Sequence, residues 1–413
     1  MNIYLALILA SLVAAWALGM ISRHLDAKNL STRPPEEFRD IIDDEAYRRS
    51  QQYNLAKMRL ESVDDTISTV ISIIFIVAGG FAWADDTVRS FGFGPLVTGL
   101  LFFGLLGLLS MIPGLPFSVY RTFVLENRFG FNKTTPETFV ADRLKAVVLA
   151  AVIGGPLLAG ILLFFRWAGP DAWLWCWGFT TLFSLAVTYV APQWILPLFN
   201  RFTPLEQGEL RQMLENYADS QGFELEGLYL MDGSKRSTKA NAFFTGFGKK
   251  RRIALFDTLV ERHTPGEITA VLAHEVGHAK LGHVRKMLVA SVLKTGLMFW
   301  LLSFFLESPR LFEAFGVQQM SVHAGLVFFA LLYTPVSMLL SLADGALSRK
   351  HEYQADAFAA RTTGRPGELA SALKRLSADS LSNLTPHPFT VWLQYSHPPV
   401  VKRVRALARH EAA

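Results

Sequence analysis

Seven long runs of apolar residues, separated by polar connections, dominate the pattern of this chain. Each run has about the twenty residues that an α-helix needs to cross the hydrocarbon core of a bilayer. The first run lacks the basic leader of a signal peptide, so we interpret it as a retained span. We therefore predict membrane-spanning helices over residues 3–21, 66–84, 95–117, 146–166, 171–195, 287–306 and 321–343.

The composition agrees with this interpretation. Hydrophobic residues make up 51% of the chain and charged residues only 18%, which is typical of a membrane protein rather than a soluble enzyme. The single cysteine, Cys176, lies in the fifth predicted span, which excludes an internal disulfide and a cysteine-rich metal site.

The basic residues predict the orientation. Lysine and arginine concentrate in the connections 23–64, 118–145 and 200–286 and in the C-terminal tail, whereas the alternate connections carry few. By the positive-inside rule the N-terminus lies outside, and the C-terminus faces the cytoplasm. The net charge of +5 reflects these loops, so no nucleic-acid partner is needed to explain it.

The polar segment inside this pattern has a strand signal. Residues 227–231 read as a strand, and residues 241–245 and 253–256 flank a turn rich in glycine and lysine, which predicts a β-hairpin. An edge strand of this kind can hold a peptide by backbone pairing. Asn241 would then contact substrate at that edge, although a turn or cap role fits the sequence equally well.

The most informative motif is His274-Glu275-Val-Gly-His278. On a helix, positions four apart share a face, so both imidazoles can bind one metal ion while Glu275 takes a proton from the attacking water. The stretch Thr-Pro-Gly-Glu at 264–267 predicts the start of that helix through a capping box. Two ordinary histidines beside a solvated glutamate are the weaker alternative.

A catalytic zinc also needs a third protein ligand. His283 does not have the metzincin spacing, so we expect it on the helix surface or beside a ligand. Glu352 and Asp356 lie four residues apart, so Glu352 could bind zinc while Asp356 holds a ligand imidazole. Spacing alone fits an exposed acidic pair equally well. His351 is a rival ligand that faces away from Asp356.

The ligand segments adjoin two predicted spans. Residues 281–285 are too few for a separate element, so the motif helix continues almost directly into the sixth span, and the seventh span continues into the Glu352 segment. A metal would then pin two spans together near the membrane surface. We divide the chain accordingly into four regions, 1–199, 200–285, 286–346 and 347–413.

A donor for the developing oxyanion is a further requirement of peptide hydrolysis. The Ser-His-Pro-Pro stretch at 396–399 precedes an expected helix, with Arg403 one turn inside it. His397 or Arg403 could supply the donor, and Tyr395 is a rival. On the residues alone, a capping His-Pro turn with a solvated arginine is slightly favoured.

Several separated motifs resemble those of one family in the same order. The chain is similar to the integral-membrane type 1 CAAX prenyl proteases, which are zinc metalloproteases, and the resemblance extends over nearly its whole length. The motifs that carry it lie at residues 123–135, 197–205, 241–247, 252–259, 274–278 and 352–356.

The resemblance implies a mainly α-helical membrane protein. Its seven spans would form a barrel-like chamber, with a small α/β zinc-protease cap on the cytoplasmic side. It also implies one Zn²⁺ per chain, a general base and a neighbouring carboxylate, an asparagine that contacts substrate, a histidine that stabilises the transition state, and a substrate-binding arginine. By motif match the ligands are His274, His278 and Glu352, and the other residues are Glu275, Asp356, Asn241, His397 and Arg403.

The implied reaction is hydrolysis near the C-terminus of a prenylated protein substrate. The absence of a retrieval signal favours a bacterial inner membrane over the endoplasmic reticulum, and we expect a monomer. One alternative is a quality-control protease like the heat-shock membrane protease HtpX, which has fewer spans. Another is a transporter or lipid-binding protein with structural zinc, which the scarcity of charge in the spans disfavours.

Overall fold

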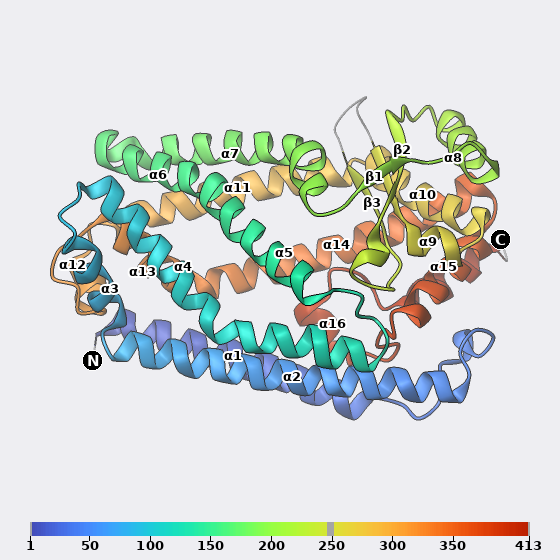
Figure 1. Cartoon of the computed structure of the whole chain (residues 1–413), viewed down its shortest axis with the longest axis horizontal. Coiled ribbons are helices and arrows are strands. Elements are labelled where there is room, and N and C mark those ends of the chain that lie inside the picture. Colours follow the sequence, from blue (N-terminus) through green and yellow to red (C-terminus); the bar gives the residue numbers. More distant parts are fainter. Residues whose placement is uncertain (1, 246–251, 412–413) are drawn as a thin grey trace.

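The apolar runs form long helices that extend along one axis of the molecule, with a small sheet at one end (Figure 1). The structure is a computed structural model that describes residues 2–245 and 252–411. The N-terminus lies at the end opposite the sheet, and the C-terminus lies beside the sheet (Figure 1). The two termini are therefore at opposite ends, as an odd number of spans requires.

Five continuous helical segments among the described residues are long and apolar enough to cross a bilayer, and two bent pairs raise the number to seven. Each predicted span matches one of these segments, and only the spans 287–306 and 321–343 extend beyond it, by one residue each, which confirms the helical membrane fold. The continuous segments are Ile3–Asn29 (α1), Pro95–Glu126 (including α4), Pro136–Trp167 (α5 and α6), Gly169–Leu198 (including α7) and His283–Phe305 (α11). The bent pairs are Asp44–Val77 with Gly80–Arg89 (α2, α3) and Val322–Leu332 with Thr334–Thr363 (α13, α14).

The two bends have local causes. Between α2 and α3 the axis turns by 64°, and Gly79 there has φ of 75°, a left-handed conformation that glycine adopts without strain. Between α13 and α14 the axis turns by 55°. Pro335 lies in the first turn of α14, where a backbone N–H has no partner within the helix and its absence costs nothing. In the middle of a continuous helix the same proline would remove a hydrogen bond, so the helix is broken here.

The sheet has four strands in the order β1-β2-β4-β3. Strand β2 (Gly227–Met231) runs parallel to β4 (Arg252–Phe256), and β3 (Ala242–Thr245) pairs with β4 as an antiparallel hairpin. The predicted strand and hairpin are thus present, while the turn at 246–251 lies outside the described residues. The sequence did not predict β1 (Phe202–Pro204).

The sheet and its helices enclose a hydrophobic core of their own. Ile268, Leu272 and Val276 of α10 (Pro265–Lys280) are buried against sheet residues such as Leu228 and Leu255. Burial of these apolar positions orients α10 about its axis, so its polar face is directed away from the sheet. The remaining helices are α8 (Glu209–Ser220), α9 (Asp257–Arg262), α12 (Pro309–Glu313), α15 (Pro366–Asp379), α16 (Pro388–Gln394) and α17 (Val400–Glu411).

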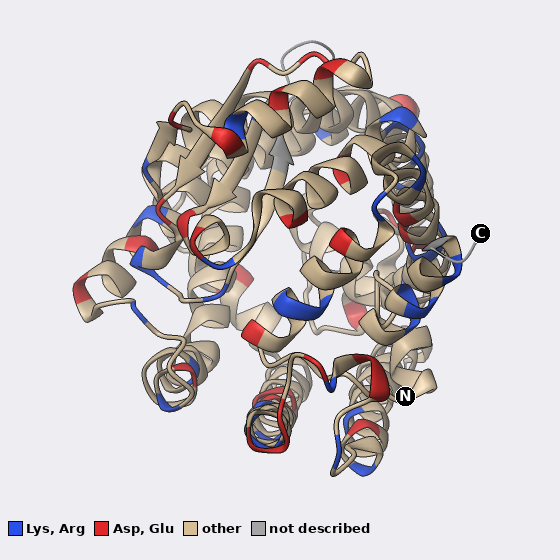
Figure 2. Cartoon of the chain, turned by 90° about the vertical axis from the view of Figure 1, so that its right-hand side faces the viewer, with Lys and Arg blue, Asp and Glu red and all other residues tan. Residues whose placement is uncertain are grey.

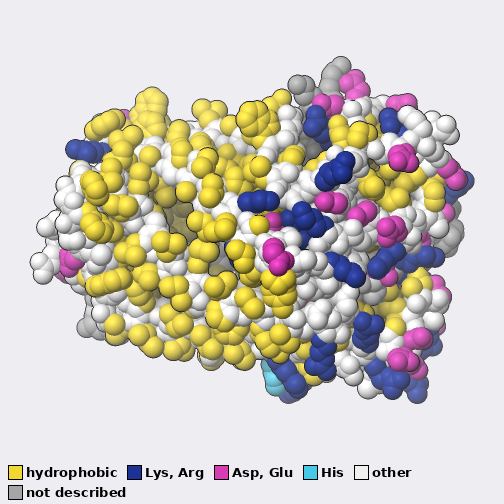
Figure 3. Space-filling model, viewed as in Figure 1, with side chains coloured by type: hydrophobic (Ala, Val, Ile, Leu, Met, Phe, Trp, Pro, Cys, Tyr) yellow, Lys and Arg dark blue, Asp and Glu magenta, His cyan; other side chains and the backbone are white. Residues whose placement is uncertain are grey.

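The surface divides into an apolar and a charged part. Figure 3 shows hydrophobic side chains over the long helices, with a hollow among them, and charged side chains gathered around the sheet end. Seen along the long axis, the helices stand around the periphery in a barrel-like arrangement (Figure 2). This is the architecture that the resemblance implied.

Candidate metal centre

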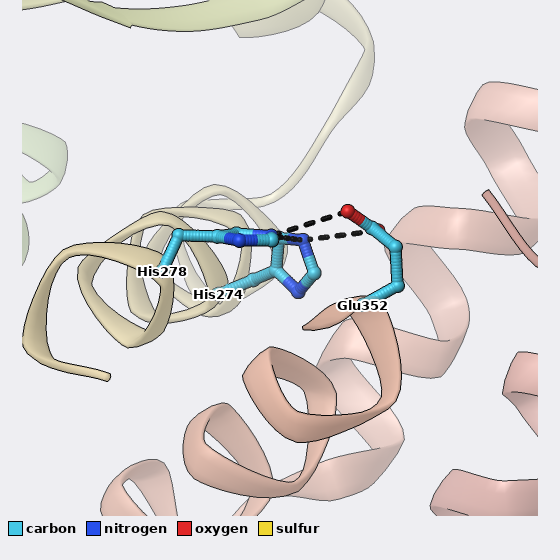
Figure 4. Close-up of side chains that lie close together, drawn as sticks. All are labelled: His274, His278 and Glu352. Carbon is cyan, nitrogen blue, oxygen red and sulfur yellow. Dashed lines mark hydrogen bonds and ion pairs between the residues drawn. The ribbon is translucent and has the colours of Figure 1, made fainter. Parts of the chain in front are cut away.

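Helix α10 presents the first two candidate ligands. Thr264 Oγ1 accepts a hydrogen bond from the Glu267 N–H at 3.2 Å, and Glu267 Oε2 accepts one from the Thr264 N–H at 2.9 Å. This capping box is the one the sequence predicted. One turn separates His274 from His278, so both imidazoles lie on the same side of the helix (Figure 4).

Helix α14 supplies the third candidate. Gly277 allows the two helices to approach closely, since a Cβ atom at that position would lie 3.2 Å from the Ala355 backbone. Glu352 therefore points across the interface toward both imidazoles (Figure 4). Its Oε1 lies 3.2 Å from His278 Nε2, and its Oε2 lies 3.4 Å from His274 Nε2. The prediction that the seventh span carries Glu352 to the motif helix agrees with this geometry.

The three side chains fit a catalytic zinc. The two Nε2 atoms are 3.1 Å apart, and neighbouring ligands of a tetrahedral zinc with bonds of about 2.0–2.1 Å are separated by about 3.3 Å. Two imidazoles and one carboxylate form a known donor set of zinc hydrolases. Glu352 Oε2 is buried and accepts no well-aligned hydrogen bond within the described part of the chain.

Asp356 and Arg403 form a buried network behind the cluster. Asp356 Oδ1 lies 2.9 Å from His274 Nδ1, which is the contact that fixes the tautomer of a ligand imidazole. Arg403 donates to both oxygens of Asp356, at 2.8 and 2.6 Å. Its Nη1 also lies 3.1 Å from Glu352 Oε2. The arginine thus connects two carboxylates that the sequence had assigned to different tasks.

The charge of Arg403 is well compensated. Burial alone would lower the pKa of its guanidinium, but the hydrogen bond with Asp356 and the negative charges of Asp356, Glu352 and Glu275 raise the pKa above its usual value. The sequence predicted substrate contact for Arg403. The side chain is only 8% exposed, so the structure places it inside the network rather than on an open surface.

His283 supports the second ligand. It lies directly after Gly282, whose φ of 68° forms the short break between α10 and α11. His283 is buried, with Nδ1 3.1 Å from His278 Nδ1 and Nε2 3.0 Å from Gln354 Oε1. His351 stacks on it at a ring distance of 4.0 Å. Neither of these two histidines belongs to the ligand cluster among the described residues.

The remaining predicted residues lie in different surroundings. His397 Nε2 is 3.4 Å from Glu352 Oε1, and its side chain is 62% exposed, so it borders the cluster from the open side. Glu275 is half-buried. Asn241 directly precedes the edge strand β3, where its carbonyl accepts a hydrogen bond from the Phe256 N–H at 3.1 Å. Within the described part of the chain, the Tyr395 side chain forms no hydrogen bond with the three ligands.

Two contacts of the ligand-bearing helices had little signal in the sequence. Gln354 is an ordinary polar residue on a helix, and only the fold places it against His283. Lys294 and Asp344 form an ion pair between α11 and α14, within helices that pattern alone marks as spans. Such a pair is stable there only when the partners face each other or water, away from lipid.

Comparisons with known proteins agree with this architecture. Residues 24–201 match the family model "CAAX prenyl protease N-terminal, five membrane helices", and residues 204–411 match "Peptidase family M48". CAAX prenyl protease 1 of Saccharomyces cerevisiae is 35% identical, over 91% of this chain and 88% of that protein. The Homo sapiens CAAX prenyl protease 1 homolog is 32% identical, over 96% and 93%.

The crystal structure of S. mikatae Ste24p is also similar, with a TM-score of 0.94, 33% sequence identity, and coverage of 98% of this chain and 99% of that one. The two family models together span most of the chain, and the similarity to the relatives extends over nearly the full length of both proteins. The chain belongs to peptidase family M48 and is a membrane metalloprotease of the CAAX prenyl protease 1 type.

Proposed function

We propose that His274, His278 and Glu352 hold one zinc ion per chain, and that this centre hydrolyses a peptide bond near the C-terminus of a prenylated substrate. The observation that carries the proposal is the cluster itself, whose donor atoms lie 3.1–3.4 Å apart. Family M48 implies a metal, and the donor set favours zinc over harder cations, which prefer oxygen ligands alone. When bound, zinc would polarise the scissile carbonyl and make the attacking water more acidic.

Two side chains assist the reaction in different ways. Glu275 takes the proton from the attacking water and passes it to the leaving amine, which is the general acid–base role of this motif. His397 donates a hydrogen bond to the oxyanion as it develops. Its exposed ring beside Glu352 supports this assignment, since a bound peptide can reach it.

Two further residues act by positioning. Asp356 holds the His274 ring through Nδ1, and Arg403 holds Asp356 through two hydrogen bonds. We propose this role for Arg403 in place of direct substrate binding. Asn241 would contact the substrate at the edge strand β3, whose outer side has no neighbouring strand among the described residues.

The substrate class comes from the relatives. Proteins named CAAX prenyl protease 1 match nearly the whole chain at 32–35% identity, so we propose a prenylated peptide or protein as substrate. The basic connections support a cytoplasmic location for the metal centre. We further propose that the protein acts as a monomer in a bacterial inner membrane, with the bilayer as its other partner.

A paired cleavage assay tests the proposal. Purified wild type and Glu275→Gln are incubated with one CAAX peptide, either farnesylated or unmodified. We expect the wild type to cleave the farnesylated form, with loss of activity in Glu275→Gln and on chelation, and recovery on addition of zinc. Cleavage that persists in Glu275→Gln contradicts the mechanism, and equal cleavage of both peptides contradicts the substrate class.

A further inference from the structure

A long groove lies between α1 and α14, outside the metal centre. Its volume is about 790 Å³, and α16 closes one end of it. Most of its lining is apolar. Representative lining residues are Leu7, Ala10, Ala14, Leu18, Leu339 and Leu342.

The groove follows one face of a single helix. Its lining residues on α1 recur every three or four positions from Leu7 to Arg23, which is the spacing of one helical face. At 1.5 Å per residue this face is about 24 Å long. Ala10 and Ala14 have small side chains and Gly19 has none, so space remains between α1 and α14 along this length. The shape suits one extended hydrocarbon chain.

Apart from Ser11 and Ser341, the polar residues that line the groove lie at the end nearest the metal centre. There Arg23 Nη1 pairs with Asp65 Oδ2 at 2.7 Å, and Arg23 Nε donates to Ser62 Oγ at 3.0 Å. Because the guanidinium already has these partners, the described residues of the groove lining offer no free cation for an anionic lipid headgroup. Gln394 and Trp392 of α16 complete this end.

Gln394 also lines a second hollow, of about 520 Å³, that leads toward the catalytic residues. This hollow is more polar, and its walls include Lys57, Ser380 and His397. His397 Nε2 lies 3.4 Å from Glu352 Oε1. An apolar groove, a polar hollow and the metal ligands therefore follow one another in space, with Gln394 at the junction of the first two.

Helix α16 is held firmly at this junction. Arg349 of α14 donates to the carbonyl oxygens of Val391, at 3.1 Å, and Tyr395, at 2.6 Å. A Cβ atom on Gly345 would lie 3.3 Å from the Tyr395 oxygen, so α16 packs directly on α14. Helix α16, fixed against α14 by these contacts, therefore contributes Gln394 to both hollows.

We infer that the groove between α1 and α14 binds the polyisoprenyl chain of the substrate, while the adjoining peptide lies in the polar hollow beside His397. This inference rests on the proposed function, because it assumes a lipidated peptide. The order of apolar groove, polar junction and metal ligands matches a molecule with one hydrocarbon chain and a peptide head. A diacyl phospholipid has two chains and an anionic head, whereas the described lining offers one narrow apolar face and no unpaired cation.

The test compares two neighbouring tryptophan substitutions on α1. Ala14→Trp fills the groove, whereas Val13→Trp adds the same side chain at a position 45% exposed and outside the groove lining. Each methylene excluded from an apolar site weakens binding about fourfold, so we expect Ala14→Trp to raise KM for a farnesylated peptide by at least about tenfold. The unmodified peptide and the Val13→Trp variant should show unchanged KM.

A binding measurement separates this inference from the proposed function. In the catalytically disabled Glu275→Gln background, a farnesyl thioether without a peptide should bind, and Ala14→Trp should weaken its binding by a similar factor. Binding of the probe supports the groove even where no peptide is cleaved. Equal binding to the Ala14→Trp and Val13→Trp proteins overturns the inference, as does displacement of the probe by diacyl phospholipid at equal concentration.

Chain length provides a graded readout. Ala10 lies one turn farther than Ala14 from the polar end of the groove, so Ala10→Trp should shorten the available space without closing it. We expect it to weaken binding of a geranylgeranyl thioether more than binding of a geranyl thioether. Equal effects on the two chains contradict the proposed direction of the hydrocarbon chain along α1.

Discussion

Replacement of Arg403 by methionine removes the charge that connects the two buried carboxylates of the site. In the structure the guanidinium forms two hydrogen bonds with Asp356, at 2.8 and 2.6 Å, and an ion pair with Glu352 at 3.1 Å. All three side chains are at most 8% exposed. Methionine fills similar space, so the main change is an uncompensated negative charge on Asp356.

Two magnitudes follow from this geometry. Breaking a buried ion pair by removal of one partner costs about 3–5 kcal/mol of folding free energy. Bound zinc would offset the charge of Glu352, so we expect Arg403→Met to lower the folding free energy of the metal-bound protein by about 3 kcal/mol, at the low end of this range. Loss of a residue that orients a metal ligand weakens metal binding about 10–100-fold. Arg403→Met should show both effects.

The assay measures zinc affinity by competition with a chelator, and thermal unfolding in detergent, for the wild type and three variants. Arg405→Met is the matched control, because Arg405 lies on the same helix and pairs with Glu37, but its side chain is 60% exposed. An exposed pair of this kind contributes at most about 1 kcal/mol. Arg403→Lys keeps the charge but not the two parallel hydrogen bonds, so an intermediate result is expected.

The reasoning fails if Arg403→Met binds zinc as tightly as the wild type. It also fails if Arg405→Met loses as much affinity, because the effect would then reflect the general charge of α17. If Arg403→Met is unfolded at room temperature, the zinc affinity of Arg403→Lys is compared with that of the wild type instead.

Four other results are expected. Gly277→Ala places a Cβ atom 3.2 Å from the backbone of α14, so it should separate the two ligand helices and weaken zinc binding at least about tenfold in a competition assay. Glu275→Gln should lower kcat by about 10²–10⁴ with little change in bound zinc measured by atomic absorption. Although burial opposes it, hydrogen bonds with two carboxylates raise the pKa of His274 to about 9 in the metal-free protein. A proton therefore competes with the metal below that pH, and zinc affinity should fall about tenfold per unit from pH 9 to pH 7; a flat profile contradicts this. Arg236 donates to both oxygens of Asp142, at 2.7 and 2.9 Å, so Arg236→Asp should lower the unfolding temperature and a second change, Asp142→Arg, should partly restore it.

Much of the membrane fold was predictable from the sequence, because a lipid-exposed helix must be apolar for about twenty residues and no other element has that pattern. The capping box at Thr264 and the strand at 227–231 also depend on a few neighbouring residues in the sequence, and both are present. The bends were not predicted. They depend on Gly79 and Pro335, and neither residue type bends every helix in which it occurs.

The site was predictable to the extent that its residues repeat at helical spacing. His274 and His278 are four apart, as are Glu352 and Asp356, but spacing did not distinguish a ligand pair from an exposed acidic pair. The family resemblance identified Glu352 as a ligand. The structure supplies the physical reason, because the close contact at Gly277 brings Glu352 of α14 next to the two histidines. The position of Arg403, 47 residues after Asp356 in the chain, depends on how α17 packs and has no local signal.

The central claim is that one zinc ion held by His274, His278 and Glu352 performs the hydrolysis. The most direct test strips the metal from the purified protein and follows peptide cleavage as zinc is added back. The account predicts that activity rises in proportion to added zinc and reaches its maximum at one ion per chain, with no recovery in Glu352→Gln at the same zinc concentration. Full activity in the metal-free protein, or recovery of Glu352→Gln to the wild-type level, would contradict it.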